Sequence, residues 1–396
     1  GGEGGEKENA MSRPVSAFQK LDKLGEGTYG SVYKARDRTS GALVALKRIK
    51  ISSDAFDREG MPLTSLREVN LLRRLRHPNV VSLLDVVVGT KLDSLFLVFE
   101  FCEHDLARLL DAMPTAFSPA EIKCLSQQLL YAVAHLHANA VLHRDLKLSN
   151  LLLASDGTLK LCDFGLARAI EPPEGKYTGR VVTLWYRAPE LLLGATTYGF
   201  AVDMWAVGCI LGELILHRPL MPAPNELKQL EMMCDLLGTP NERIWPEYSS
   251  LPLASSIQLR SQPYNELPSV FAGKRPTAET LALLNALLTY DPRKRISARA
   301  ALDHEYFKQR PPPQRKSLLT AARLPGEFSR QGTLKRTNPH VTHGGAGAGV
   351  TAEPHRTACM QSLAEEGGEG VVQAACGPRA RKPSCSGCTS SENGVT

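Results

Sequence analysis

A pair of short polar segments constrains the fold of this chain more than any other feature, because both must meet at one site. Residues 143–150 read HRDLKLSN, and residues 163–165, which begin thirteen residues after Asn150, read DFG. Asp145 is a candidate base, Lys147 can steady a moving phosphoryl group, and Asn150 and Asp163 offer the oxygen ligands that Mg²⁺ prefers. Phosphoryl transfer depends mainly on positioning and electrostatics. The ordered set therefore predicts a phosphoryl-transfer site and argues against an ordinary polar loop.

A glycine-rich segment near the N-terminus predicts a second part of the same site. Residues 25–32 read GEGTYGSV, and Gly25, Gly27 and Gly30 let backbone N–H groups approach phosphates without an intervening Cβ. A dinucleotide-binding fold would place a helix directly after such a loop. Residues 31–36 instead continue as a strand-like run, so the context favours the phosphate-covering loop of a protein kinase.

An ion pair between Lys47 and Glu68 is the third prediction. Lys47 lies in a strand-like run, residues 43–49, from which it can bridge the α- and β-phosphates if an acid holds it in place. Glu68 is the expected acid, at the end of the segment PLTSLRE, residues 62–68, which opens a helix. The apolar positions of that helix recur at threes, at Leu66, Val69, Leu72 and Leu75. The alternative for Glu68 is a solvated helix charge.

The distribution of apolar residues predicts one folded region between two polar ends. Residues 17–310 form the expected folded part, whereas residues 1–16 and the basic Gly/Ser/Pro-rich tail, residues 311–396, are expected to be disordered. Short β-branched and apolar runs separated by turns predict a sheet in the first portion. The rest has helical periodicity and begins with a capping box, SPAE, at residues 118–121. An apolar stripe predicted to face the core follows it, at Ile122, Leu125, Leu129, Val133 and Leu136. The predicted fold class is α+β.

Composition limits the expected cellular location of the protein and the classes of partner that it binds. Of the 396 residues 43% are hydrophobic, yet no apolar run reaches membrane-spanning length and no N-terminal apolar segment resembles a secretory signal. The nine cysteines show no framework spacing, which predicts free thiols. We therefore expect an intracellular protein without membrane binding, for which Met11 is a candidate initiator. The tail has ten Lys and Arg residues against six Glu, so we expect no specific nucleic-acid binding.

Together these residues give a resemblance to a known family. Residues of about 18–310 resemble the protein kinase fold, and PLTSLRE resembles the signature helix of the cyclin-dependent kinases, lying near the PISSLRE and PITSLRE groups of that family. Four further segments favour the PISSLRE group, namely residues 101–106, 203–209, 217–220 and 262–265. The resemblance implies a bilobal fold, with a β-rich N-lobe over about 17–101 and a mainly helical C-lobe over about 102–310.

The resemblance implies a cyclin-dependent serine/threonine kinase that uses ATP and Mg²⁺. A cyclin would press on the helix at residues 62–68 and seat Glu68 on Lys47, and cyclin M is the partner implied for the PISSLRE group. The catalytic residues implied are Asp145, Lys147, Lys47 and Glu68, and the metal ligands Asn150 and Asp163. The ATP-binding residues implied are Leu24, Gly25, Gly27, Gly30, Val32, Ala45, Lys47, Phe99, Glu100, Cys102 and Leu152.

Two regulatory phosphosites follow from the same resemblance. Thr178 stands where the family carries its activating phosphothreonine, and the matching arginines are Arg67, Arg144 and Arg168, whose guanidinium groups suit phosphate. Thr28 and Tyr29 match inhibitory phosphosites, because negative charge in the glycine-rich loop would repel ATP phosphates. A purely structural role in the loop is the alternative for Thr28 and Tyr29.

The family's preference for a substrate proline is implied by a third set of residues. Val181, Val182 and Arg187 resemble the pocket that accepts proline, whose missing N–H leaves no buried donor unpaired. The expected substrates are therefore Ser-Pro and Thr-Pro sites, in cell-cycle or transcription-linked regulation, with residence in the nucleus, the cytoplasm or both. Thr183 resembles the threonine that contacts the catalytic Asp and Lys in serine/threonine kinases.

Two other classes of function compete with an active kinase. A pseudokinase or scaffold would bind a cyclin without transferring phosphate, but none of Lys47, Glu68, Asp145, Asn150 and Asp163 is missing. Alternatively the basic tail would be the working part, as a nucleic-acid or regulatory arm, although its charge is dilute. An active, cyclin-dependent kinase is the prediction that accounts for most residues.

Overall fold

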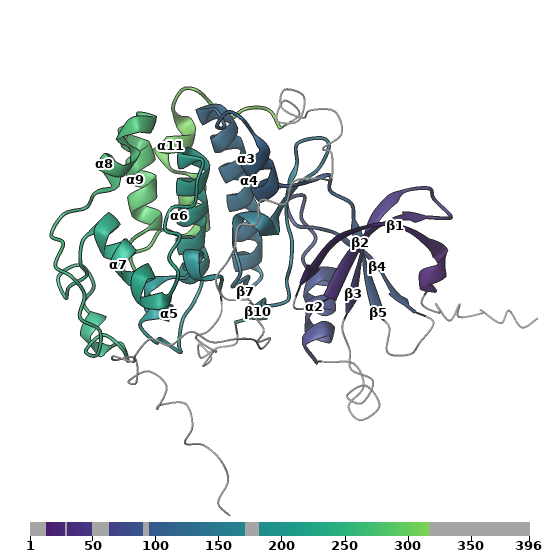
Figure 1. Ribbon diagram of the computed structural model, residues 1–396, viewed down its shortest axis with the longest axis horizontal. Helices are drawn as coiled ribbons and strands as arrows, with labels where there is room; N and C mark the ends of the chain where they lie inside the picture. The colour runs from purple at the N-terminus through teal and green to yellow at the C-terminus, as the bar shows by residue number, and fades with distance from the viewer. Residues whose placement is uncertain (1–12, 28–29, 50–62, 90–94, 171–181, 317–396) are drawn as a thin grey trace, which may run out of the picture. The chain divides into compact units, whose positions relative to one another are not determined.

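The N-terminal part of the chain is a five-stranded antiparallel sheet accompanied by one helix (Figure 1). The computed structural model describes residues 13–27, 30–49, 63–89, 95–170 and 182–316. The strand order is β1-β2-β3-β5-β4. The elements are η1 (Val15–Ala17), β1 (Phe18–Gly27), β2 (Gly30–Asp37), β3 (Leu43–Ile49), α2 (Leu63–Arg74), β4 (Leu83–Val88) and β5 (Leu95–Glu100).

The two faces of this sheet belong to different apolar clusters, because alternate residues of a strand point to opposite sides. One face carries a small cluster of its own that includes Leu46 and Phe96. The other face contributes Leu97 and Phe99 to the main core, together with Leu72 of α2. The second face is therefore the one that continues toward the C-terminal part of the fold.

The C-terminal part is mainly helical, with short strands near the junction with the sheet (Figure 1). Its helices are α3 (Leu106–Ala112), α4 (Pro119–Ala138), α5 (Pro189–Leu192), α6 (Ala201–Leu216), α7 (Glu226–Leu237), α8 (Leu267–Phe271), α9 (Ala278–Leu287), α10 (Ala298–Leu302) and α11 (Glu305–Lys308). Its strands are β6 (His104–Asp105), β7 (Val141–Leu142), β8 (Leu151–Leu153), β9 (Leu159–Leu161) and β10 (Arg168–Ala169), arranged as β6-β8-β9 and β10-β7. Its 3-10 turns are η2 (Leu148–Asn150), η3 (Leu184–Tyr186), η4 (Tyr248–Ser250) and η5 (Ala272–Lys274).

The start of α4 has the local structure that its sequence predicts. The Ser118 hydroxyl accepts a hydrogen bond from the Glu121 N–H at 3.3 Å, and the Glu121 carboxylate accepts one from the Ser118 N–H at 2.7 Å. Pro119 is the first helical residue, where its missing N–H costs nothing. The predicted core stripe is buried, at Ile122, Leu125, Leu129, Val133 and Leu136. Both the capping box and the stripe are confirmed.

Helix α6 is buried on all sides within the C-lobe core and is apolar apart from Asp203 and Glu213. Every residue from Val202 to Leu216 is buried, as expected for a helix surrounded by protein. At Gly208 an added Cβ would lie 2.8 Å from the Leu288 side chain and 2.9 Å from that of Leu287, so glycine allows the close approach of α9. Helix α6 is thus a well-packed support for Asp203, whose carboxylate accepts hydrogen bonds from the backbone of His143 and Arg144.

The described chain continues past residue 310 and lies against α4. Lys123 of α4 is buried, and its ammonium group donates to the carbonyl oxygens of Gln309 and Pro311, both at 2.9 Å. The Gln314 N–H donates to the Ala120 carbonyl at 2.9 Å, and the Lys316 ammonium lies 2.9 Å from Asp156 Oδ2. We call residues 309–316 the C-terminal strap.

The predicted fold class is confirmed, because a β-rich N-lobe and a mainly helical C-lobe make up the described chain. Among the described residues, no helix combines the length with the apolar character that a bilayer crossing would need.

Candidate active site

Three polar side chains of the catalytic loop, which connects β7 to β8, lie together with the Thr183 hydroxyl from a later segment. Asp145 is buried and accepts hydrogen bonds from the Lys147 ammonium at 2.7 Å, the Thr183 hydroxyl at 3.0 Å and the Asn150 amide at 3.1 Å. Lys147 also donates to the Thr183 hydroxyl at 3.1 Å. The contacts expected of Thr183 are therefore present. The arrangement holds one carboxylate in a fixed direction beside a cation, as a positioned base requires.

Asp203 of α6 holds the catalytic loop from behind. It accepts hydrogen bonds from the backbone N–H groups of His143, at 3.0 Å, and Arg144, at 2.9 Å. His137 Nε2 lies 3.0 Å from the same carboxylate. Burial alone would raise the pKa of Asp203, but these hydrogen bonds and the neighbouring histidines hold it below its ordinary value. An ionised Asp203 therefore fixes the backbone just before Asp145.

Arg144 has a left-handed backbone conformation and a buried side chain. Its φ is +65°, which is rare for a residue other than glycine. Its Nε donates to the Leu166 carbonyl at 2.8 Å and its Nη1 to the Tyr198 hydroxyl at 3.0 Å. These contacts join the catalytic loop to the segment that follows Asp163.

Lys47 lies between two carboxylates. Its ammonium group is 2.8 Å from Glu68 Oε1 and 3.2 Å from Asp163 Oδ1, so the predicted Lys47–Glu68 contact is present. Burial alone would lower the pKa of Lys47, but the charges of Asp163 and Glu68 raise it above its ordinary value. The pKa of Asp163 is lowered, because the attraction of Lys47 outweighs the effect of burial. The site therefore contains a charged lysine beside an ionised carboxylate.

The register of the sheet places four of the predicted ATP-binding residues on one face. Val32 is opposite Lys47, and Ala45, two residues before Lys47, is opposite Phe99. Residues two apart, and residues directly opposite, share a face of a sheet. Gly30 has a φ of +144°, and a Cβ there would overlap the Arg48 carbonyl oxygen. Glycine at this position thus lets the loop end directly against β3.

The other predicted nucleotide residues come from the neighbouring strands and the segment after β5. Leu24 and Gly25 belong to β1, in which Gly25 is opposite Val32, and Leu152 lies on β8 opposite Asp105. The Glu100 carboxylate accepts hydrogen bonds from the Ser82 N–H and the Lys160 ammonium. Burial raises the pKa of Cys102 to about 12, and that of Cys162 well above its ordinary value. Both thiols are therefore protonated near neutral pH.

Several predicted residues lie outside the part of the chain that the structure describes. They are Thr28, Tyr29, Thr178, Val181 and the side chain of Arg67. Gly27 pairs with Gly30 across the hairpin. Arg168 donates from Nη1 to the carbonyl of Ala167 at 3.0 Å. The activating and inhibitory phosphosites therefore stay predictions.

Val182 is a second residue with a left-handed backbone conformation, and the Arg187 side chain binds its carbonyl group. Val182 is buried and has a φ of +70°, which strains a β-branched residue. The Arg187 guanidinium donates to the Val182 carbonyl from Nε at 3.3 Å and from Nη2 at 3.1 Å. Its Nη1 lies 2.5 Å from Glu226 Oε1. Sequence reasoning did not include Glu226, because an acidic residue at the start of a helix is common and carries no specific signal.

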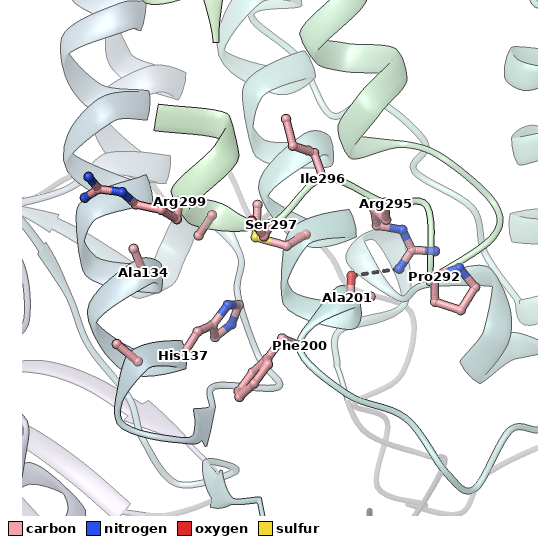
Figure 2. A pocket seen from close by; sticks show the side chains of 12 residues that line it. Ala134, His137, Phe200, Ala201, Pro292, Arg295, Ile296, Ser297 and Arg299 are labelled. Carbon is pink, nitrogen blue, oxygen red and sulfur yellow. Dashed lines mark hydrogen bonds between the residues drawn. The ribbon is translucent and has the colours of Figure 1, made fainter. Parts of the chain in front are cut away.

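A pocket of about 380 Å³ lies between the C-terminal end of α4, the start of α6 and residues 292–299 (Figure 2). Its walls include His137 and Phe200, whose rings lie 4.5 Å apart between centroids. Arg295 borders it and donates to the Ala201 carbonyl at 2.7 Å and to Glu190 at 2.8 Å. The pocket therefore adjoins residues that hold the C-lobe together. One of its lining residues, His137, also contacts the Asp203 carboxylate.

Comparisons with known proteins agree with this geometry. The protein kinase domain family matches residues 18–307. Cyclin-dependent kinase 10 of Bos taurus is 52% identical over 78% of this chain and 84% of its own length. The chain belongs to the cyclin-dependent kinase family. Cyclin-dependent kinase 10 of Homo sapiens is 51% identical over the same shares, and human cyclin-dependent kinase 11B is 47% identical over 85% of this chain and 41% of that protein.

A solved structure supports the same assignment of this cyclin-dependent kinase. The crystal structure of the yeast RNA Pol II CTD kinase CTDK-1 complex includes a chain with a TM-score of 0.71 and 39% identity, covering 78% of this chain and 98% of that chain. The predicted family and fold are confirmed. The protein is a cyclin-dependent serine/threonine protein kinase.

Proposed function

We propose that this kinase transfers the γ-phosphoryl group of Mg-ATP to serine or threonine residues followed by proline, when a cyclin is bound. The observation that carries the preference for proline is the Val182 carbonyl, which Arg187 binds through two N–H groups. A carbonyl held by Arg187 is not available to a substrate N–H. Leaving such a donor unpaired costs about 1–3 kcal/mol, and proline avoids this cost because it has no N–H.

The transfer step is assigned to the catalytic loop. Asp145 orients the substrate hydroxyl and accepts its proton, and Lys147 donates to the moving phosphoryl oxygens. Thr183 contributes by holding both side chains, as its bonds to Asp145 and Lys147 indicate. The nearby Asp203 fixes the backbone of this loop, so that the base does not have to be ordered during the reaction.

Asn150 and Asp163 fit the role of Mg²⁺ ligands. The Asn150 amide nitrogen donates to the Asp145 carbonyl at 2.7 Å and to its carboxylate at 3.1 Å, which leaves the amide oxygen to act as a ligand. Asp163 is ionised, because its pKa is lowered mainly by Lys47 against the effect of burial. Both ligands are hard oxygens, as Mg²⁺ requires, and the ion would neutralise phosphate charge during transfer.

ATP is proposed to lie against the sheet face that carries Val32, Ala45 and Phe99, with Leu152 beneath the base. Lys47 would contact the α- and β-phosphates, since Glu68 holds its ammonium group in place. The backbone of residues 100–102 would meet adenine, and Gly25, Gly27 and Gly30 would cover the phosphates.

Cyclin binding is proposed at residues 62–68, and cyclin M is the proposed partner. The link between α2 and the site supports this, because movement of α2 would move Glu68 relative to Lys47. Phosphorylated Thr178 is proposed to bind Arg67, Arg144 and Arg168, while phosphate on Thr28 or Tyr29 would repel ATP. A role in cell-cycle or transcription-linked regulation is proposed, the latter because the similar solved structure is that of a yeast RNA Pol II CTD kinase complex.

Residence in the nucleus, the cytoplasm or both is part of the same proposal. Imaging of the tagged chain in cells tests it, and a secreted or membrane-bound chain would contradict it.

Paired peptides test the proposed substrate class. The kinase–cyclin complex is given Mg-ATP and two peptides that differ only in having Pro or Ala after the phosphorylated Ser. We expect kcat/KM to be at least about tenfold higher for the Ser-Pro peptide, as one buried unpaired donor would cause. Equal values would contradict the preference for proline, and no transfer despite bound cyclin would favour a scaffold.

A further inference from the structure

The Arg187 guanidinium has contacts on both of its edges. The edge formed by Nε and Nη2 donates to the Val182 carbonyl, at 3.3 and 3.1 Å. On the other side Nη1 lies 2.5 Å from Glu226 Oε1. The guanidinium is planar and its N–H groups have fixed directions, so a partner on one edge sets the direction of the other. Glu226 therefore orients the group that holds the Val182 carbonyl.

Glu226 is well placed for this because its own backbone is fixed. It is the first residue of α7, and the preceding Asn225 caps the helix by accepting a hydrogen bond from the Lys228 N–H at 2.9 Å. A buried apolar face, including Leu230 and Met233, holds α7 on the C-lobe. The carboxylate of Glu226 thus approaches Arg187 from a rigid element, 39 residues away along the chain.

The segment between Val182 and Arg187 is also tied to the residues just before α7. Trp185, within η3, donates its indole N–H to the Ala223 carbonyl at 2.9 Å. The Arg187 side chain is 13% exposed, whereas that of Glu226 is 47% exposed. The carboxylate therefore remains partly in water while its charge reaches a mostly buried guanidinium.

We propose that Glu226 is a positioning residue for substrate selection: it holds Arg187, which in turn keeps the Val182 carbonyl away from the substrate. This proposal rests on the proposed preference for proline. Val182 is strained at its positive φ, so its peptide group relaxes if Arg187 is released. The freed carbonyl then accepts a hydrogen bond from a substrate N–H, and residues other than proline become acceptable.

The test uses Glu226→Gln in the kinase–cyclin complex, with the Ser-Pro and Ser-Ala peptides. The amide keeps the shape of the side chain but removes its charge. We expect the ratio of kcat/KM for the two peptides to fall by about fivefold to tenfold, the effect of weakening one charge-assisted hydrogen bond. Most of the change is expected as a higher kcat/KM for Ser-Ala. Glu226→Asp, which keeps the charge on a shorter side chain, is expected to give an intermediate ratio.

Glu231→Gln is the matched control, because Glu231 lies on the same helix and pairs with Lys228 at 3.0 Å. Its ratio is expected to equal that of the unmodified complex. General damage to the fold lowers both kcat/KM values together and leaves their ratio unchanged. If the unmodified complex prefers the Ser-Pro peptide and the Glu226→Gln complex has the same ratio, this proposal is overturned and the proposed preference for proline stands. An unmodified complex that does not distinguish the peptides overturns the proposed preference, and this proposal with it.

Discussion

At the scale of single residues, Asp145 illustrates how the candidate site is ordered before any substrate arrives. Side chains from two parts of the chain donate to its carboxylate, namely Lys147, Asn150 and Thr183. Because a buried carboxylate with several donors has one stable direction, the reacting geometry need not be found by chance. Thr183 is the donor that can be altered with the smallest change of shape.

Replacing Thr183 tests how much this ordering contributes. Thr183→Ala removes the hydroxyl that bonds both Asp145 and Lys147, so we expect kcat to fall by about tenfold to a hundredfold. The KM for ATP is expected to change little, because the Thr183 hydroxyl contacts Asp145 and Lys147, neither of which is among the proposed ATP-binding residues. Thr183→Ser keeps the hydroxyl and is expected to restore most of kcat. Steady-state kinetics of the three complexes would contradict this account if the serine variant were as slow as the alanine variant.

The partly buried thiols of Cys102 and Cys162 permit a second test at this scale. Burial raises the pKa of Cys102 to about 12 and that of Cys162 well above its ordinary value, so almost no reactive thiolate exists at pH 7.5. We expect iodoacetamide to alkylate both at least about tenfold more slowly than it alkylates a peptide cysteine. Mass spectrometry of digested protein over time measures the rates. Rapid alkylation of Cys162 in the folded chain would contradict the protonated state.

Residues differ in how far the sequence predicts them. Asp145, Asn150 and Asp163 belong to short ordered motifs, so their chemistry is visible without a fold. Tyr198 and Glu226 were not predicted, because they meet Arg144 and Arg187 across 54 and 39 residues of chain. A single tyrosine or glutamate belongs to no local sequence pattern that predicts such a contact, because the contact depends on how the elements pack.

At the scale of elements, α4 joins several parts of the C-lobe. Its capping box and apolar stripe follow from local sequence and were predicted correctly. The binding of the C-terminal strap by Lys123 was not, because the partner carbonyls are 186 and 188 residues away. From the sequence alone, a lysine within a helix is expected to be an ordinary surface charge. Its hydrogen bonds to the strap are visible only in the folded structure.

Lys123→Met tests how much these hydrogen bonds to the C-terminal strap stabilise the fold. The methionine keeps the apolar length of the side chain but donates nothing to the carbonyls of Gln309 and Pro311. We expect the free energy of unfolding to fall by about 1–3 kcal/mol, since two partly buried hydrogen bonds from a charged donor are lost. Urea unfolding followed by tryptophan fluorescence measures the change. The exposed Lys308, which pairs with Glu305, serves as control through Lys308→Met, expected within about 0.5 kcal/mol of the unmodified chain.

A shortened chain makes this test specific. In a chain ending at residue 308, Lys123→Met is expected to have a much smaller effect, because the strap is gone while the contact of the ammonium group with the Tyr306 ring, 5.0 Å from its centroid, remains. Equal destabilisation in the long and short chains would show that Lys123 acts through something other than the strap.

At the scale of the whole molecule, the site is assembled from both lobes. Lys47 of the N-lobe sheet contacts Asp163 of the C-lobe at 3.2 Å, and Glu68 of α2 contacts the same lysine at 2.8 Å. A partner that moves α2 therefore acts on the charges around Lys47. The family and the fold class could be predicted from the sequence because its motifs occur in a fixed order along one chain. The distances that join them required the structure.

The measurement that tests the central claim most directly is transfer of labelled γ-phosphate from Mg-ATP to a Ser-Pro peptide. The purified chain is assayed alone and with a candidate cyclin, and Asp163→Asn in the same complex is the control. We predict transfer that depends on the cyclin and falls by at least about a hundredfold in the control, because Asp163, the proposed metal ligand and a partner of Lys47, loses its charge. Absence of transfer by a complex with bound cyclin and phosphorylated Thr178 would contradict the account, as would equal activity in the Asp163→Asn complex.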